Sequence, residues 1–155
     1  MNKYSKSLLA IILLAVSSAC FFNVIKHNQD KAAIRAVEFA EAAFVERNVD
    51  KAFSLLAPVS QNYYSKEKIA ELLITMNSPT SPAVVTATEF EPAPGQELMS
   101  IFLVGENGDE KFYYRLELLG TEPKDYRVSG LFRGRGQYPP SQLRKPLPIK
   151  RLTSD

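Results

Sequence analysis

The strongest constraint in the sequence is Asn107-Gly108, which lies between two runs of alternating apolar residues in ELMSIFLVGENGDEKFYYRLELL. Asn-Gly is the preferred sequence of a two-residue type I′ turn, because both central positions need a positive φ. The pair therefore predicts an antiparallel hairpin with its turn at these two residues. Pairing across this turn places three apolar pairs on one face: Leu103 with Phe112, Ile101 with Tyr114 and Met99 with Leu116.

Two further segments have the composition of strands. Residues 83–91, AVVTATEFE, are rich in β-branched residues, and PAPGQ separates them from the hairpin. Residues 125–134, DYRVSGLFRG, again alternate. The alternation predicts two opposite faces for this last strand: Tyr126, Val128 and Phe132 on one, and Arg127, Ser129 and Arg133 on the other.

The region before these strands has the periodicity of helices. Residues 30–47, DKAAIRAVEFAEAAFVER, predict one amphipathic helix. Asn48 suits a left-handed stop after Arg47, and Asp50 is placed to cap a second, short helix, KAFSLL, which Pro58 ends. The buried stripe of the first helix is expected to contain Ala33, Val37, Ala40 and Phe44.

A third helix is predicted in YYSKEKIAELLITMN, with Ser65 at its cap and Tyr64 and Ile69 at the positions of a hydrophobic staple. Residues 77–82, NSPTSP, end the helical half of the chain. Helices followed by a meander of strands predict an α+β domain, with the helices on one face of a curved, four-stranded antiparallel sheet. The stripe of the third helix is expected to contain Ile69, Leu72, Leu73 and Met76.

Residues 1–25 have the order of a signal or membrane anchor, because Lys3 and Lys6 precede an apolar run that leads through small residues to Cys20. One interpretation is a bacterial lipoprotein with Cys20 as the lipid attachment site. VSSAC resembles the lipobox, although Ser17 stands where a leucine-like residue is usual.

A second interpretation is an uncleaved membrane helix. Leu8 to Ile25 is 18 largely apolar residues, which nearly spans the hydrocarbon core of a bilayer at 1.5 Å per residue. A third is a cleaved, soluble form. Lys3 and Lys6 favour a cytoplasmic N-terminal end. All three interpretations place residues 26 onward on the periplasmic, extracytoplasmic side of the inner membrane.

The composition excludes several kinds of site. One cysteine and one histidine, Cys20 and His27, form neither an internal disulfide nor a zinc site of the usual nitrogen and sulfur ligands. The chain has no glycine-rich phosphate loop and no nucleophile elbow, so we expect no cofactor and no metal. A net charge of only +2 gives no general case for binding nucleic acid.

The segment AVEFAEAAFVERNVDKAFSLLAP, followed by the helix-then-meander order to about residue 136, resembles the nuclear transport factor 2-like (cystatin-like) superfamily. The resemblance implies a cone-shaped pocket between the helices and a curved sheet. In enzymatic members such as ketosteroid isomerase and scytalone dehydratase, an aspartate or histidine, often with a tyrosine, lies in that pocket. Many anchored bacterial members have no assigned activity.

No residue set makes a convincing active site of this kind. His27 lies next to the anchor, away from the implied pocket. Glu89 and Glu91 are candidate acids, but they alternate with Phe90 and are expected to be solvated on an edge strand. Four tyrosines are candidates to line the pocket but are more often half-buried core: Tyr63, Tyr64, Tyr114 and Tyr126.

Two features point to binding instead. The face of the sheet opposite the core is expected to be an apolar interface, which a homodimer partner, the C-terminal tail or a helix would cover. Residues 139–155 form a proline-rich, basic tail that suits anionic lipid or a partner protein. The interface residues are Leu98, Phe102, Val104, Tyr113 and Leu131, and the basic residues are Arg133, Arg135, Arg144, Lys145, Lys150 and Arg151.

The sequence therefore predicts three parts: an anchor in 1–25, an α+β domain in 26–138 and the basic tail in 139–155. The leading functional hypothesis is a membrane-tethered module without catalytic activity that binds an envelope protein or a small apolar ligand. The alternative is a small isomerase or dehydratase with a buried carboxylate and a tyrosine. A purely structural lipoprotein is a third hypothesis.

Overall fold

The computed structural model describes residues 25–76 and 79–147. Within these ranges, helices precede an antiparallel sheet, so the α+β prediction is confirmed. The helical segments are α2 Gln29–Ala40, the π-helical turn η1 Glu41–Val45, α3 Val49–Ser54, α4 Pro58–Tyr63 and α5 Lys66–Met76. The strands are β1 Val84–Pro92, β2 Leu98–Asn107, β3 Glu110–Leu119, β4 Arg127–Gly134 and β5 Lys145–Pro146.

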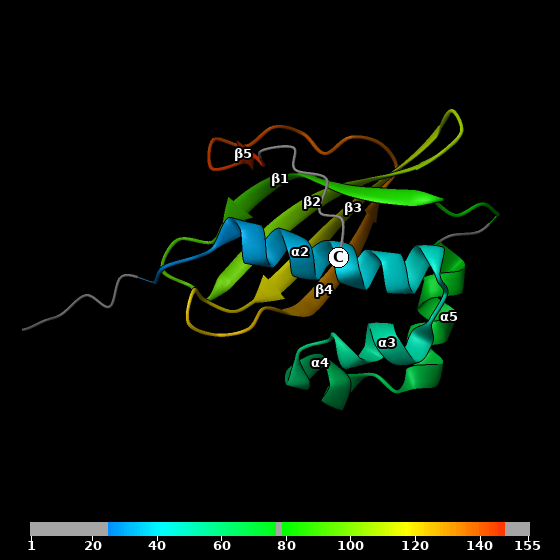
Figure 1. Ribbon diagram of the computed structural model, residues 1–155, viewed down its shortest axis with the longest axis horizontal. Coiled ribbons are helices and arrows are strands. Elements are labelled where there is room, and N and C mark those ends of the chain that lie inside the picture. The colour runs from blue at the N-terminus through cyan, green and yellow to red at the C-terminus, as the bar shows by residue number, and fades with distance from the viewer. Residues whose placement is uncertain (1–24, 77–78, 148–155) are drawn as a thin grey trace, which may run out of the picture.

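The molecule has a helical layer on one face of the sheet (Figure 1). The strand order is β4-β3-β2-β1-β5, and every neighbouring pair is antiparallel. Helix α2 crosses this sheet, whereas α3, α4 and α5 gather beside its β4 end (Figure 1). The largest side chains of the core between these layers include Phe39, Phe44, Ile101, Leu103, Phe112 and Tyr114.

The first predicted helix is confirmed as a continuous run from Gln29 to Val45, but its two ends differ from the prediction. Asn28 is the N-cap, and its side chain accepts a hydrogen bond from Lys31 N. At the other end, Arg47 itself takes the left-handed conformation, with φ 53°. Asn48 is therefore free to cap α3, where its Oδ1 accepts from Lys51 N at 3.0 Å.

Asp50 and Pro58 have different roles from those predicted. Asp50 lies in the first turn of α3 and pairs with Lys66 at the start of α5, which ties the two helices together. Pro58 does not end a helix but begins α4 at its first position, where a missing N–H costs nothing. Because Pro58 is predicted to end a helix, the sequence does not predict α4. The predicted third helix is confirmed, and the Ser65 hydroxyl accepts from Lys68 N at 3.3 Å.

The hairpin is present, but its turn lies one residue further along the chain. Asn107 pairs with Glu110, so Gly108 and Asp109 are the central residues of the turn. Among the described residues, Arg47 is the one non-glycine with a positive φ, and Gly108 has φ 59°. This pattern fits a type II′ turn, in which only the first central residue needs a positive φ.

The shift in the turn changes the partners across β2 and β3 by two residues. Leu103 pairs with Tyr114 and Ile101 with Leu116. Because side chains alternate with a period of two, an even shift leaves every residue on its predicted face. The six predicted core residues of the hairpin are accordingly all buried: Met99, Ile101, Leu103, Phe112, Tyr114 and Leu116.

An irregularity in β4 reverses part of the predicted pattern. Leu118 pairs with Val128 and Glu117 with Gly130, which leaves Ser129 as an extra residue. A bulge of one residue exchanges the faces of everything beyond it. Leu131 therefore packs against the core, and Phe132 lies on the outer face with 42% of its surface exposed, so the prediction for both residues is wrong.

The sheet has one strand more than predicted. After β4, residues 137–147, here called the strap, cross the outer face of the sheet and end in β5 beside β1 (Figure 1). Leu147 N donates to Thr88 O at 2.9 Å. Strand β1 is thus not an edge strand where Glu89 and Phe90 pair with β5. The described part of the predicted basic tail lies against the domain.

The position of the hairpin turn can be tested by substitution. We expect Gly108→Val to lower the free energy of unfolding by about 1 to 3 kcal/mol, because a β-branched residue is strained at a positive φ. Asn107→Thr should cost only about 1 kcal/mol, because position 107 belongs to a strand and the substitution removes one exposed hydrogen bond, from Asn107 Nδ2 to Ser81 O. Chemical denaturation measures both values. Equal losses in the two variants would instead place residue 107 inside the turn.

Candidate functional site

Helix α5 separates two apolar cavities. One has a volume of about 380 Å³ and lies between α5 and the end of the first helix, with Ala43, Ala70 and Ile74 in its wall. The other has a volume of about 260 Å³ and lies between α5 and β4, with Leu72, Met76 and Leu131 in its wall. Leu73 lies between the two cavities and contributes to both.

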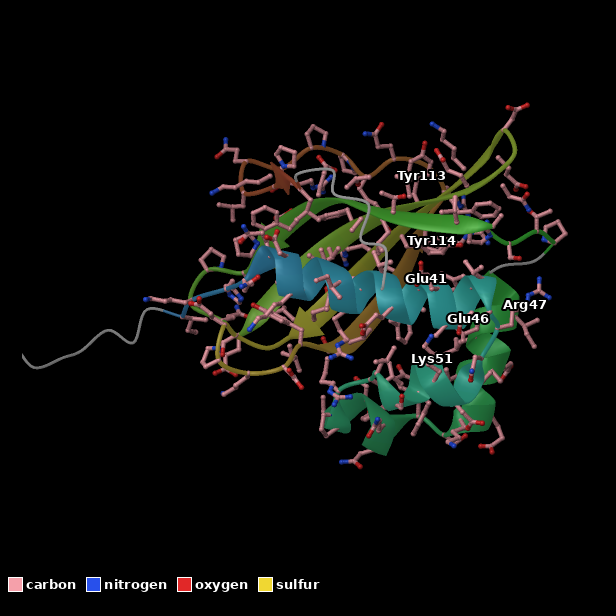
Figure 2. The ribbon with its side chains drawn as sticks, in the orientation of Figure 1. Glu41, Glu46, Arg47, Lys51, Tyr113 and Tyr114 are labelled. Atoms are coloured by element: carbon pink, nitrogen blue, oxygen red, sulfur yellow. The ribbon has the colours of Figure 1, made fainter. Side chains whose placement is uncertain are left out.

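The turn before α3 forms the rim of the larger cavity. Arg47 and Val49 lie at this rim. Figure 2 shows Arg47 beside Glu46, and Lys51 bonds the Glu46 carboxylate at 3.1 and 3.2 Å. The Arg47 guanidinium donates to the Ser81 hydroxyl at 3.1 Å. The left-handed backbone at Arg47 thus places a cation beside an apolar hollow.

The smaller cavity is bounded by the β4 bulge. Ser60 of α4 donates from its hydroxyl to Ser129 O at 3.2 Å, and the Ser129 hydroxyl donates to Glu117 O at 3.1 Å. These bonds hold α4 against the bulged strand. Because the bulge turns Leu131 inward, this residue closes one wall of the cavity opposite α5.

Neither cavity contains a buried acid or base. Among the residues that line the two cavities, Ser60 is the one polar residue that is buried as a whole. Glu117 borders the smaller cavity, but its side chain is 30% exposed and lies 3.5 Å from the Arg115 guanidinium. Ligand recognition in these cavities would rest on shape and apolar contact rather than on proton transfer.

The predicted tyrosines do not gather in one site. Tyr63 is 84% exposed and Tyr64 is 39% exposed, although Tyr64 reaches the wall of the smaller cavity. Tyr126 is buried, and its hydroxyl accepts from Asn28 N at 2.8 Å. Burial raises the pKa of Tyr126 above its usual value. This residue therefore anchors the start of α2.

Tyr114 belongs to the hydrophobic core. Its ring stacks on Phe44 with centroids 4.3 Å apart, and both residues are fully buried. Burial raises the pKa of Tyr114 to about 12. Figure 2 shows the neighbouring Tyr113 and Tyr114 on β3, and their alternation places Tyr113 on the outer face.

The candidate carboxylates and the histidine lie outside both cavities. Glu89 and Glu91 are on the outer face, where they pair with Arg144 rather than standing alone in solvent. Asp109 is exposed in the hairpin turn. His27 lies near the start of α2, with Nε2 3.0 Å from Gln96 O.

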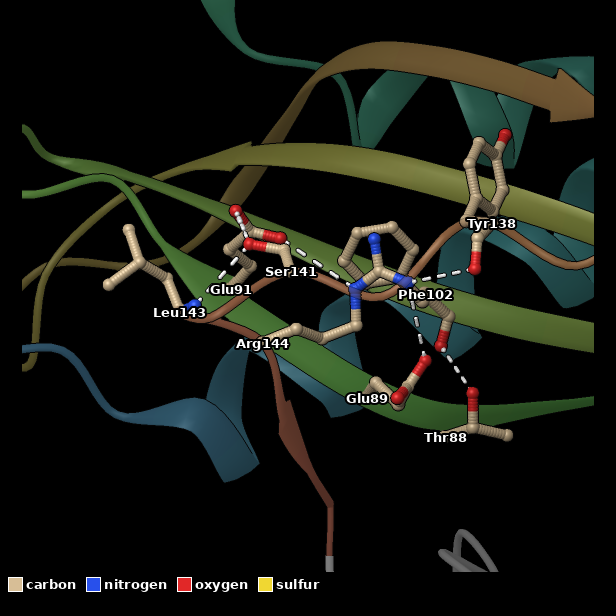
Figure 3. Close-up of polar contacts among 8 residues, drawn as sticks. All are labelled: Thr88, Glu89, Glu91, Phe102, Tyr138, Ser141, Leu143 and Arg144. Carbon is tan, nitrogen blue, oxygen red and sulfur yellow. Dashed lines mark hydrogen bonds and ion pairs between the residues drawn. The ribbon is translucent and has the colours of Figure 1, made fainter.

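The predicted outer interface is partly covered by the chain itself. Phe102 is only 4% exposed, because Tyr138 packs edge-on against its ring at 5.4 Å and Arg144 lies over it (Figure 3). Leu98, Val104 and Tyr113 stay half-buried on this face. Phe132 takes the outward position predicted for Leu131, and the Arg115 guanidinium lies 4.4 Å from its ring.

The basic residues of the predicted tail have different surroundings. Arg144 packs against the outer face of the sheet, and its side chain is only 8% exposed. Arg133 lies over the Phe112 ring at 5.2 Å. Arg135 and Lys145 are exposed, whereas Lys150 and Arg151 lie outside the described residues.

The predicted anchor falls almost entirely outside the part of the chain that the structure describes. Cys20 and most of the predicted anchor, residues 1–24, lie outside the described residues. In residues 25–76 and 79–147, no helix is long and apolar enough to span a membrane. The same residues contain no group of three or more histidine, cysteine or acidic side chains placed to hold a metal ion.

Comparison of the chain with models of protein families, with curated proteins and with solved structures finds no match.

The high pKa of Tyr114 makes the fold sensitive to alkali. The unfolded phenol ionises near pH 10, whereas the buried one stays neutral to about pH 12, so stability falls as the pH rises through this window. We expect Tyr114→Phe to remove about 2 to 3 kcal/mol of that fall. The measurement that checks this is the free energy of unfolding from about pH 9 to about pH 12, a range that includes both pKa values.

Tyr63→Phe is the matched control, because that ring is 84% exposed. Its pH profile should coincide with that of the unmodified chain. An unchanged profile in Tyr114→Phe would show that Tyr114 ionises in the folded protein as easily as in the unfolded one. Some slope is expected to remain even in Tyr114→Phe, because burial also raises the pKa of Tyr126.

Proposed function

We propose that the chain is a membrane-tethered, extracytoplasmic binding module without catalytic activity, and that its ligand is a small apolar molecule or the apolar side chains of a protein partner. The observation that carries this proposal is the pair of apolar cavities on the two sides of α5. The larger, at about 380 Å³, falls in the range of typical small-molecule sites, about 300 to 1,000 Å³.

The surface around the cavities supports a binding role. Ile74 of α5 is 72% exposed at the edge of the larger cavity. Val59 and Tyr63 of α4 are 58% and 84% exposed. Apolar side chains that leave water on binding contribute favourably in rough proportion to their area. The α4 and α5 layer therefore gives an apolar partner more apolar surface to bury than a polar helical surface would.

The tether is proposed from the sequence. Lys3 and Lys6 precede the apolar run that includes Cys20, and this order is typical of segments that enter or cross the inner membrane. A membrane anchor or a lipid on Cys20 would hold the domain near the bilayer, where apolar ligands and envelope proteins are concentrated. Mass spectrometry of the mature N-terminus separates the two forms.

We also propose membership of the nuclear transport factor 2-like superfamily. Support comes from the order of elements, in which α2 crosses the sheet and the shorter helices close one side of it. The smaller cavity, between those helices and β4, has the position that a cone-shaped pocket would have. The described residues supply no buried carboxylate there, so no observation favours the isomerase or dehydratase alternative.

Titration of the isotope-labelled protein with decanoate tests the binding proposal. We expect shifts in the methyl resonances of Leu72, Leu73 and Ile74, which line the cavities, and not in that of Leu103, which lies in the closed core. Ala70→Leu should fill part of the larger cavity and weaken binding by about tenfold, since each apolar CH₂ excluded from contact costs about 0.8 kcal/mol.

Glu71→Leu is the matched control for Ala70→Leu. It adds the same side chain one residue away, at an exposed position of α5. Its affinity for decanoate should equal that of the unmodified protein. Uniform shifts over the whole surface, or equal effects of the two substitutions, would contradict a ligand site in these cavities.

A further inference from the structure

The strap and the outer face of the sheet together form a peptide complex within one chain. Three parts of the sheet receive the strap: the Phe102 ring, the carboxylates of Glu89 and Glu91, and the backbone of β1 (Figure 3). Each part meets a different feature of the strap. Such a combination of strand pairing and side-chain slots is a recurring way in which proteins recognise extended peptides.

The central slot is built for a guanidinium group. The Arg144 Cζ lies 3.7 Å from the centroid of the Phe102 ring, and its nitrogens lie 3.7 Å from one oxygen of Glu89 and one oxygen of Glu91. A flat, delocalised cation can stack on a ring while it faces carboxylates in its plane, which the compact ammonium of lysine does less well. The slot therefore selects arginine.

Flanking contacts fix the direction of the peptide. Ser141 donates from its hydroxyl to Glu91 Oε1 at 3.0 Å on one side of Arg144. On the other side Lys145 and Pro146 pair with Phe90 and Glu89, and Leu147 is buried at 6% exposure. The site thus holds a segment that turns between Ser141 and Arg144, where Arg144 N donates to Ser141 O at 3.2 Å, and then continues as a short strand to a buried leucine three residues after the arginine.

The site does not depend on the strap for its own shape. Glu89 and Glu91 belong to β1, and Phe102 belongs to β2. These strands pair with each other, and Ile101 and Leu103 on the opposite face of β2 are buried in the core. Removal of the strap would therefore leave the slot in place, exposed and with two unpaired carboxylates.

The strap follows β4 after a short connection, Arg135 and Gly136, and its first contact with that strand is the Tyr138 hydroxyl, which donates to Phe132 O at 3.1 Å. Arg135 and Gly136 are exposed in this connection. Within the strap, Arg144 donates to Tyr138 O at 3.3 Å and Leu143 N donates to the Ser141 hydroxyl at 3.3 Å. These internal bonds would persist if the strap bound elsewhere.

We propose that the outer face of the sheet is a recognition site for an arginine-bearing peptide that turns just before the arginine and pairs as a strand just after it, which the strap fills in its own chain and which the strap of a second copy fills in exchange. The exchanged form makes the same contacts as the closed form, so the connection at residues 134–136 and the protein concentration set the balance between them. This peptide site is separate from the apolar cavities beside α5, and it does not depend on a ligand in them.

Complementation between two full-length variants tests the exchange. Arg144→Ala keeps the slot but loses the strap's arginine, and Glu89→Gln with Glu91→Gln keeps the strap but loses the charge of the slot. In a mixture, the intact strap of the second variant should enter the intact slot of the first. We expect a heterodimer by analytical ultracentrifugation in the mixture, at concentrations where each variant alone is a monomer.

A peptide titration tests the slot separately. The full-length Arg144→Ala protein is titrated with a labelled peptide of residues 137–147, QYPPSQLRKPL. We expect binding by fluorescence anisotropy, and an affinity about tenfold lower for the same peptide with Arg144→Lys, because lysine keeps the charge but loses the planar stack on the Phe102 ring. The unmodified protein should bind the labelled peptide more weakly than the variant, because its own strap fills the slot.

Circular dichroism establishes that each variant is folded, and Phe102→Leu provides a second variant that weakens the slot without a change of charge.

A mixture that sediments as two monomers would overturn the exchange. A peptide that binds equally with arginine or lysine, or binds equally to the variant and the unmodified protein, would overturn the slot. Decanoate binding in these variants should be unaffected, which separates this outcome from a failure of the proposed apolar site.

Discussion

The contact on which the rest of the structure depends is the stack of Phe44 on Tyr114, with ring centroids 4.3 Å apart. Phe44 lies in the π-helical turn at the end of the first helix, and Tyr114 lies in β3 near the middle of the sheet. Because both rings are fully buried, their contact sets where the helix crosses the sheet. It also fixes the point from which the chain continues toward α3, α4 and α5.

The core between α2 and the sheet is filled with side chains and leaves no room there for the two apolar cavities. The inner face between α2 and the sheet is closed by aromatic and branched side chains, and the two apolar cavities beside α5 lie away from it. Ile69 and Leu73 are the two buried residues of α5, and Lys66 ties the start of this helix to Asp50 of α3. An element held by so few buried side chains leaves apolar surface open on both of its flanks.

The two faces of the sheet use different physical interactions. Apolar burial holds the helices to the inner face, whereas the contacts of the strap on the outer face include a cation over a ring, with two carboxylates beside it. Apolar burial is insensitive to the identity of a partner beyond its shape. The slot for Arg144 demands a particular charge and a planar group, and so it discriminates among partners more strongly.

The sequence by itself determined the α+β order, the length of the first helix and the buried face of the hairpin, because these follow from local periodicity. Even the misplaced turn left Leu103 and Tyr114 on the core face, since a shift of two residues conserves alternation. Tertiary structure alone decided the faces of Leu131 and Phe132, because the extra residue at Ser129 appears only when β4 pairs with β3.

Tertiary structure alone also decided which residues form the candidate sites. The sequence predicted an apolar outer face and a basic tail as separate features, and no local signal joined Arg144 to Phe102, which lies 42 residues earlier in the chain. The cavities beside α5 likewise combine side chains from distant elements. Periodicity assigns a residue to a face of its own helix or strand, but only the packed fold decides which other residues share that face and whether space remains between them.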